Sequence, residues 1–470
     1  MDTKSFRKYG HDFIDWLANY FEDIENYPVK PNVKPGDILG QLPASAPQQA
    51  ESIDHIFNDF KQKILPGITH WQHPGWMAYF PANNSPASVL GELLTAGLGA
   101  QCMIWQTSPA AAELEERVLD WLRQMIGLPG TFTGVIQDTA STATLCALLT
   151  AREKATNLQS NQKGIQKRLR VYTSTETHSS IEKGMKIAGY GKENLCFIQT
   201  DSAFSMNPVA LEQAINEDQA AGYQPACVVA ALGSTSSMAM DPVDAIAAIC
   251  KKYHIWLHVD AAFAGTAAVV PELRGFMKGT EHADSFVFNP HKWMLTNFDC
   301  TAYFVKDPGM LIQTFEIHPE YLKTSADHQV KNYRDWGIQL GRRFRALKLW
   351  FVIRSYGIEG IQKMVREHVR LAWLFESWIG SDNRFEIMAP VHLSLVCFRL
   401  NPGNMKQEQL NKLNQELLQK INSNGRVFMT HTSLRGNYTI RLAIGSRATE
   451  ERHVKQAWEI VSQAAYDLLA

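Results

Sequence analysis

Apolar residues in the middle of the chain occur in short runs that alternate with helical patterns. Each run is rich in β-branched or aromatic residues, whereas the segments between the runs show the three- and four-residue spacing of amphipathic helices. This alternation, over about residues 86–345, predicts a mostly parallel sheet with helices on both faces. The candidate strands are Val135–Ile136, Arg170–Tyr172, Leu195–Ile198, Val228–Ala230, Ile255–Leu257 and Phe286–Phe288.

A seventh apolar run, Cys300–Val305, follows the last of these strands closely. Parallel neighbours need a crossover of about a dozen residues or more, usually with a helix, so this run is expected to pair antiparallel. The pattern therefore predicts an α/β fold with a seven-stranded, mostly parallel sheet.

The pattern changes toward both ends of the chain. Near the N-terminus an aromatic stripe predicts a helix that ends near Tyr27–Pro28, before a proline-rich connector. This stripe has no evident partner within its own short segment. It consists of Phe13, Trp16, Leu17, Tyr20, Phe21 and Ile24.

After Arg345 a long helical pattern covers Leu347–Tyr356 and continues beyond it. Strand patterns follow at residues 393–398 and 438–442, and a closing helix begins at about Glu450. We therefore expect an N-terminal helical segment (residues 1–85), a large domain (86–350) and a small C-terminal α+β domain (351–470).

Composition and charge disfavour several classes of function. Lysine and arginine number 46 and aspartate and glutamate 47, so the net charge is -1, without the basic tract of a nucleic-acid binder. The polar N-terminal residues predict neither a signal peptide nor a membrane anchor. The seven cysteines are scattered without a Cys-x-x-Cys pair, as expected for free thiols in the cytoplasm.

Lys292 is the first candidate for chemistry, because it stands directly after an apolar strand that stops at Asn289–Pro290. In open α/β sheets, ligands bind in the crevice beyond the carboxyl ends of the strands. A surface lysine after a turn is the commoner explanation, so Lys292 needs support from other strand ends.

Asp260 gives that support, because it ends another apolar strand among small apolar residues. A carboxylate there is costly unless it faces a cation or caps the next helix. A pyridinium nitrogen is such a cation. At ~4 Å and an effective dielectric constant of ~20, the attraction is about 4 kcal/mol, which favours the protonated ring by roughly three pKa units.

Two further motifs follow strand ends. Thr139, Ala140 and Ser141 lead into a helix, whose free amides and hydroxyls either bind an anion such as phosphate or serve as simple caps. His178 lies between a strand and a helix, where its ring either stacks on a planar group or is structural. The chain has no nucleoside-triphosphate loop, no Gly-x-Ser-x-Gly elbow and no convincing metal-ligand spacing.

Together these motifs resemble those of the group II, fold-type-I pyridoxal phosphate decarboxylases, specifically the aromatic-L-amino-acid decarboxylases. The resemblance covers nearly the whole chain. It rests on His73–Ala82 (HPGWMAYFPA), Gly134–Gln137 (GVIQ), Thr177–Lys183 (THSSIEK), Leu257–Ala262 (LHVDAA), Asn289–Trp293 (NPHKW), Leu340–Arg345 (LGRRFR) and Ser446–Arg447.

The resemblance implies that pyridoxal 5'-phosphate is the cofactor and that an aromatic L-amino acid loses its α-carboxylate to give an amine. It implies that Lys292 carries the cofactor as a Schiff base, that Asp260 faces the ring nitrogen and that His178 stacks on the ring. The other cofactor contacts that it implies are Thr139, Ala140, Ser141, Thr235, Ala262, Asn289 and His291.

The substrate contacts that the resemblance implies are Tyr79, Phe80, Pro81, Ala82, Met103, His178 and Gly341. Ala82 departs from the animal enzymes, which usually carry a hydroxyl residue there, and Met103 replaces an aromatic residue, so substrate detail is not carried over. Gly341 resembles the aromatic enzymes, whereas histidine decarboxylases and the plant tyrosine enzymes tend to carry serine. It therefore favours a bulky ring.

The resemblance also implies a lid and a dimer. The stretch 316–329 is polar, with few apolar residues to tie it down, and in the resembling decarboxylases its tyrosine folds over the site and delivers a proton. Tyr321 is then the proton donor, although a surface tyrosine fits the composition. In the same family the N-terminal segment holds a second subunit, so we expect a homodimer with shared sites.

Three alternatives stay open. An aromatic aldehyde synthase shares these motifs but consumes oxygen and releases an aldehyde, ammonia and hydrogen peroxide; residue 321 discriminates. Decarboxylation of a non-aromatic amino acid such as glutamate requires a cation for the second carboxylate, whereas Arg342, Arg343 and Arg345 look structural. A catalytically inactive binding protein is disfavoured because Lys292 and its two partners are present.

Overall fold

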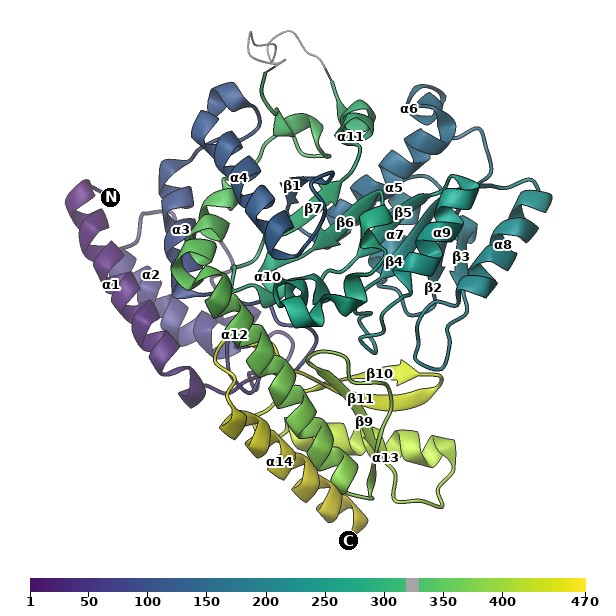
Figure 1. Cartoon of the computed structure of the whole chain (residues 1–470). Helices are drawn as coiled ribbons and strands as arrows, with labels where there is room; N and C mark the ends of the chain where they lie inside the picture. Colours follow the sequence, from purple (N-terminus) through teal and green to yellow (C-terminus); the bar gives the residue numbers. More distant parts are fainter. Residues whose placement is uncertain (318–328) are drawn as a thin grey trace.

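The computed structural model describes residues 1–317 and 329–470 and has two sheets (Figure 1). The larger sheet has the strand order β1-β7-β6-β5-β4-β2-β3. β7 runs antiparallel to β1 and β6, and the other neighbours are parallel, which confirms the predicted seven-stranded sheet. The strands are β1 (Thr133–Gln137), β2 (Leu169–Ser174), β3 (Leu195–Ile198), β4 (Gln224–Ala231), β5 (Trp256–Asp260), β6 (Ser285–Phe288) and β7 (Thr301–Val305).

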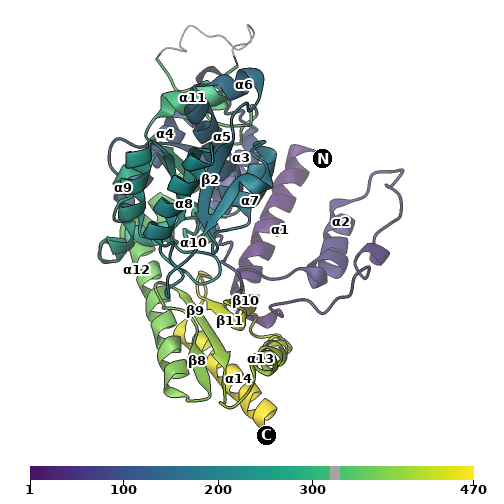
Figure 2. The same cartoon turned by 90° about the vertical axis from the view of Figure 1, so that its right-hand side faces the viewer.

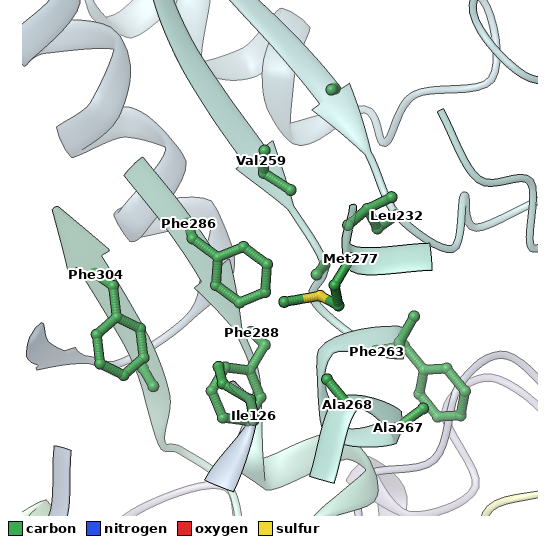
Figure 3. Packing of buried hydrophobic residues seen from close by; sticks show 14 of the residues in the cluster. Ile126, Leu232, Val259, Phe263, Ala267, Ala268, Met277, Phe286, Phe288 and Phe304 are labelled. Atoms are coloured by element: carbon green, nitrogen blue, oxygen red, sulfur yellow. The ribbon is translucent and has the colours of Figure 1, made fainter. Parts of the chain in front are cut away.

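Helices cover both faces of this sheet, because successive strand residues point to opposite sides. Val228 and Ala230 of β4 pack with one cluster, whereas Cys227 and Val229 pack with another. Figure 3 shows the first face, where Phe286, Phe288 and Phe304 of β6 and β7 lie close together.

The helices beside the large sheet differ in which face they cover. α4, α8 and α9 belong to the first cluster, and α5, α7 and α11 lie on the other face. The helices of this part are α3 (Pro86–Leu98), α4 (Pro109–Met125), α5 (Ala140–Thr156), α6 (Gln159–Lys163), α7 (Ser180–Ile187), α8 (Pro208–Ala220), α9 (Val243–Tyr253), α10 (Pro290–Trp293) and α11 (Pro308–Phe315).

The smaller sheet is antiparallel and has the order β10-β11-β9-β8. Its apolar side packs against α12, α13 and α14 in a cluster of its own. Its elements are α12 (Arg345–Ser381), β8 (Phe385–Ile387), β9 (Leu395–Leu400), α13 (Gln407–Asn422), β10 (Thr430–Leu434), β11 (Asn437–Ala443) and α14 (Glu451–Leu469). The closing helix from about residue 450 is confirmed.

Two connections tie the parts together. α12 bends at Gly357, whose φ is 64°, and contacts α3 and α4 at one end and the small sheet at the other (Figure 1). Met77 donates to the Phe428 carbonyl and its own carbonyl accepts from Ala443, so the N-terminal segment lies beside the small sheet. The limits at residues 85 and 350 stay a prediction.

The N-terminal segment extends from one flank of the molecule (Figure 2). α1 (Thr3–Glu22) ends earlier than predicted, and a short 3-10 turn, Ile24–Asn26, carries the chain to Tyr27. The expectation that its aromatic stripe has no partner within the segment is wrong. Trp16 packs edge-on against two rings: that of Phe57, on α2 (Ile53–Asp59), and that of Phe60, directly after α2. None of the helices in the described ranges combines the length and apolar character needed to span a lipid bilayer.

Candidate active site

A cavity of about 220 Å³ lies beyond the carboxyl ends of β1, β2, β4, β5 and β6. Parallel strands place these ends at one edge, so residues far apart in the sequence meet there. The lining residues are Phe80, Thr139, Ala140, Ser141, His178, Ser180, Ala231, Gly233, Ser234, Thr235, Asp260, Ala262, Phe263, Asn289, His291, Lys292 and Phe298.

Lys292 reaches this cavity from α10, the four-residue helix after β6. Its Nζ lies 5.6 Å from the centroid of the Phe80 ring. Burial lowers the pKa of Lys292, and the nearby Asp260 carboxylate opposes the shift only partly. A lysine with a lowered pKa is more readily available as the neutral amine, which is the nucleophilic form.

Asp260 ends β5 and presents its carboxylate to the same cavity. Its Oδ1 accepts a hydrogen bond of 3.0 Å from the Ala262 N–H, which fixes the orientation of the side chain. Its Oδ2 has no hydrogen-bond donor within the part of the chain that the structure describes. The carboxylate therefore has one oxygen ready to bind a cationic N–H group of a ligand.

His178 follows β2 and faces the cavity. Its Nδ1 accepts from the Ser180 N–H at 3.2 Å and lies 2.8 Å from Ser180 Oγ, so the neutral ring carries its proton on Nε2. Burial is the main cause that lowers the pKa of His178, and it outweighs the attraction of Asp260. The site thus holds a neutral, flat imidazole, which suits stacking on a planar ring.

The third region of the cavity is rich in hydrogen-bond donors. Thr139 caps α5, and its own N–H is taken by Asp138, which leaves the amides of Ala140 and Ser141 at the helix N-terminus. Such amides, with the positive end of a 17-residue helix, favour an anion. The helix-capping role and an anion-binding role are therefore compatible in the same residues.

Two side chains after β6 complete this donor set. Asn289 Oδ1 accepts from Thr301 Oγ1 at 2.8 Å, so its amide N–H groups remain to donate. His291 Nδ1 accepts from the Cys300 N–H at 3.0 Å, which places its proton on Nε2. Burial lowers the pKa of His291 to about 3, so the ring is a neutral donor. Together with a reactive amine, a free carboxylate oxygen and a flat ring, these donors fit a phosphorylated heteroaromatic aldehyde.

Thr235 and Ala262 also line the cavity, as the resemblance implies. The Thr235 carbonyl accepts from the buried Arg441 at 2.7 Å, and the Arg441 guanidinium lies 5.4 Å from the Phe80 ring centroid. Arg441 thus ties β11 to the loop after β4 at the cavity wall.

The residues expected to contact the substrate are not all brought together. Phe80 and His178 line the cavity, whereas five others are absent from its described lining. These are Tyr79, Pro81, Ala82, Met103 and Gly341. Tyr321 lies outside the described residues.

The three arginines near residue 342 are paired away from the cavity. Arg342 forms a buried bidentate pair with Glu115, with N–O distances of 2.7 and 3.1 Å, and Arg345 pairs with Asp299. Arg343 pairs with Glu92. The interpretation that they are structural is confirmed by these contacts.

The sequence analysis missed two rings that stack with Phe80 beside the cavity, and it missed one buried amide side chain. Phe263 stacks on Phe80 at 4.2 Å and on Trp293 at 4.5 Å, in planes within 7° of parallel. Asn83 is 2% exposed and binds the main chain around Lys292. Phe263 directly follows the recognised motif Leu257–Ala262, and Trp293 is the last residue of the motif Asn289–Trp293, so both positions offered a usable signal. Nothing near Asn83 in the sequence indicates its partners.

Comparisons with known proteins agree with this geometry. A family model described as the pyridoxal-dependent decarboxylase conserved domain matches residues 35–401. Tyrosine decarboxylase 2 of Narcissus pseudonarcissus is 46% identical, over 100% of this chain and 96% of the relative. Phenylacetaldehyde synthase of Arabidopsis thaliana is also 46% identical, over 100% and 97%. A crystal structure of Oryza sativa TDC with PLP and tryptamine superimposes with a TM-score of 0.97 at 37% identity, over 100% of this chain and 99% of that chain.

Proposed function

Because the chain belongs to the pyridoxal-dependent decarboxylase family, we propose that it converts an aromatic L-amino acid into the corresponding amine and carbon dioxide. The observation that carries the proposal is the meeting of Lys292, Asp260, His178 and the anion-binding donors in one cavity. Pyridoxal phosphate, when bound, supplies the electron sink for the bond that breaks between Cα and the carboxylate.

In this proposal each group has a defined role. Lys292 would bind the cofactor covalently, Asp260 would keep the ring nitrogen protonated, and His178 would cover one face of the ring. The phosphate would be held near the N-terminus of α5 by residues that line the cavity. These are Thr139, Ala140, Ser141, Thr235, Asn289 and His291.

The charges around the cavity favour a substrate with an uncharged side chain. Apart from Lys292, no lysine or arginine in residues 1–317 and 329–470 lines the cavity. Arg342 and Arg345 already have carboxylate partners, and Arg441 donates to the carbonyls of Thr235 and Ser236 and to the hydroxyl of Thr430. Among the described residues that line the cavity, a second substrate carboxylate therefore has no arginine partner and no lysine partner besides Lys292, whereas the rings of Phe80 and Phe263 suit an aromatic side chain.

The second candidate is an aromatic aldehyde synthase, which the sequence identities support equally well. The identity of 46% is the same for a tyrosine decarboxylase and for a phenylacetaldehyde synthase. The two outcomes differ in the fate of the carbanion, which takes a proton to give the amine or meets oxygen and water to give aldehyde, ammonia and hydrogen peroxide. The tyrosine at position 321 favours the amine.

One experiment decides between them. The enzyme is incubated with tryptophan, 5-hydroxytryptophan, dopa, tyrosine, phenylalanine, histidine and glutamate, and amines are identified by mass spectrometry alongside a peroxide assay. We expect amine without peroxide from the aromatic substrates. Peroxide and aldehyde in equal amounts would establish the synthase, and amine from glutamate alone would exclude an aromatic substrate.

Tyr321→Phe tests the proton donor. We expect carbon dioxide release to persist while aldehyde, ammonia and peroxide replace most of the amine, because the carbanion survives long enough to react with oxygen. Carbon dioxide, amine and peroxide are measured in the same reaction. Wild-type amine yield without peroxide would show that another group delivers the proton.

We also propose that the protein forms a homodimer whose two chains share the active sites. We propose further that it is located in the cytoplasm. α3 exposes four leucines, at positions 90, 93, 94 and 98, next to the flank from which α1 extends, and such apolar patches favour association. The seven cysteines are all free thiols, as expected in a reducing compartment. Light scattering tests the dimer, since an active particle of 52.9 kDa would contradict it. Cell fractionation tests the location.

A further inference from the structure

α10 is too short to provide hydrogen-bond donors for its own backbone carbonyls. The carbonyls at the end of any helix lack partners within the helix, and α10 has only four residues, Pro290–Trp293. Asn83 supplies the missing donors twice. Its backbone N–H donates to the His291 carbonyl at 3.1 Å, and its side-chain Nδ2 donates to the Lys292 carbonyl at 2.7 Å.

The rest of the Asn83 amide binds a third segment of the chain. Nδ2 also donates to the Gly445 carbonyl at 2.5 Å, and Oδ1 accepts from the Arg447 N–H at 3.0 Å. A side chain at residue 445 would collide with Pro81, so glycine permits this close approach. The amide is 2% exposed and has both donors and its acceptor occupied.

From this geometry we propose that Asn83 is the positioning residue of Lys292, which locks the main chain of the cofactor lysine to the segment after β11. The proposal rests on the proposed function, because it assumes that Lys292 binds pyridoxal phosphate. The lysine side chain has four rotatable bonds, so its Nζ is placed reproducibly only if its main chain is fixed. The Phe80 ring restricts the other end of the side chain at 5.6 Å.

The chain contains a matched control. Asn414, on α13, is fully buried and makes the same number and kinds of side-chain hydrogen bonds, to β9 and within α13. Its Oδ1 accepts from the Leu400 N–H at 2.7 Å, and its Nδ2 donates to the carbonyls of Leu400 and Leu410 at 2.8 and 2.9 Å. Losing either amide removes two donated hydrogen bonds and one accepted hydrogen bond from buried groups, but only Asn83 touches the segment of Lys292.

The experiment compares Asn83→Ala and Asn414→Ala as holoenzymes. Unfolding temperature, the rate of cofactor loss to a scavenger, and the pH titration of the bound-cofactor absorbance are measured for both. We expect similar decreases in unfolding temperature. Only Asn83→Ala is expected to lose cofactor about tenfold faster, as one lost hydrogen bond at the lysine implies, and to shift the absorbance titration.

Equal cofactor loss and unchanged titrations in the two variants would overturn the role of Asn83. If Asn83→Ala yields no folded protein, the same comparison between Asn83→Ser and Asn414→Ser decides, because serine keeps a shorter donor. Borohydride reduction and peptide mapping of the wild type separate the two levels of the argument. A label on another lysine overturns the cofactor assignment and this inference with it, whereas a label on Lys292 with equal loss rates overturns the role of Asn83 alone.

Discussion

The cofactor half and the substrate half of the proposed site are built differently. Lys292, Asp260 and His178 follow strand ends of one sheet and meet in a cavity within a single chain. Met103 and Gly341 lie on loops outside that cavity. The difference suggests a division of labour: groups that need fixed geometry lie at rigid strand ends, whereas the residues proposed to select the substrate lie partly on loops, which the proposed dimer would bring to the site of a second chain.

The loops that carry Met103 and Gly341 are nevertheless held in place by hydrogen bonds. The Cys102 N–H donates to the Arg342 carbonyl at 3.0 Å, and the Arg334 N–H donates to the Met103 carbonyl at 2.9 Å. The Arg342 side chain pairs with Glu115, which also accepts from the Ile136 N–H of β1. The segments that carry Met103 and Gly341 are therefore tied to each other and, through Glu115, to β1 of the large sheet.

The largest expected effect removes the covalent link of the cofactor half. Lys292→Ala should abolish turnover and the absorbance of the bound cofactor, because the amine that holds and activates it is gone. Absorbance spectra and amine release measure this, and borohydride should label only the wild type. Wild-type turnover in the variant would refute the central assignment.

Asp260→Asn should be the next largest change. It keeps the accepted bond from Ala262 but removes the charge that favours the protonated ring by roughly three pKa units, so kcat should fall about a thousandfold. Steady-state kinetics at saturating cofactor measure the effect. A kcat within tenfold of wild type would mean that the carboxylate only accepts the hydrogen bond from the Ala262 N–H and has no role in the reaction.

Arg342→Met tests the anchoring of the substrate half. Leaving Glu115 buried without its partner should lower the free energy of unfolding by about 3 kcal/mol and raise KM while the cofactor spectrum stays normal. Denaturant unfolding and kinetics measure both. The double variant with Glu115→Gln should recover part of the stability, and a normal KM would separate Arg342 from substrate binding.

Gly341→Ser should have the smallest effect. The new Cβ would lie 3.4 Å from Gln101 Nε2, an ordinary contact, so folding should be unaffected. In the proposed dimer the added side chain narrows the substrate space, so kcat/KM for tryptophan relative to tyrosine should fall about tenfold. Competition between the two substrates measures the ratio, and an unchanged ratio would remove Gly341 from the selectivity argument.

The sequence predicted the parts of the molecule whose signals are local. The strands of the large sheet were predicted from their apolar runs. Asp260 was recognisable because it ends one of these strands, and Lys292 because it lies shortly after another. β10 was not predicted, because its sequence THTSL carries almost no apolar alternation and it is stabilised by pairing with β11.

Residues that act through distant partners were not predictable in the same way. Asn83 looks like an ordinary polar residue after Pro81, since its partners Lys292 and Gly445 are 209 and 362 positions further along. The packing of the N-terminal stripe on Phe57 and Phe60 was missed because the sequence of the proline-rich connector does not indicate that the chain turns back there. Tertiary contacts, and not local preference, decide such positions.

The pairing of the N-terminal segment with the small sheet has a consequence for biosynthesis. Ribosomes add about 5–20 residues per second, so roughly 20–70 s separate the translation of Asn83 from that of Gly445. During that time Lys292 and the large sheet can emerge and collapse, but the Asn83 amide still lacks two of its three side-chain partners. Nascent chains that stop short of residue 445 should therefore hold pyridoxal phosphate loosely, and firm loading should wait until translation has passed that residue.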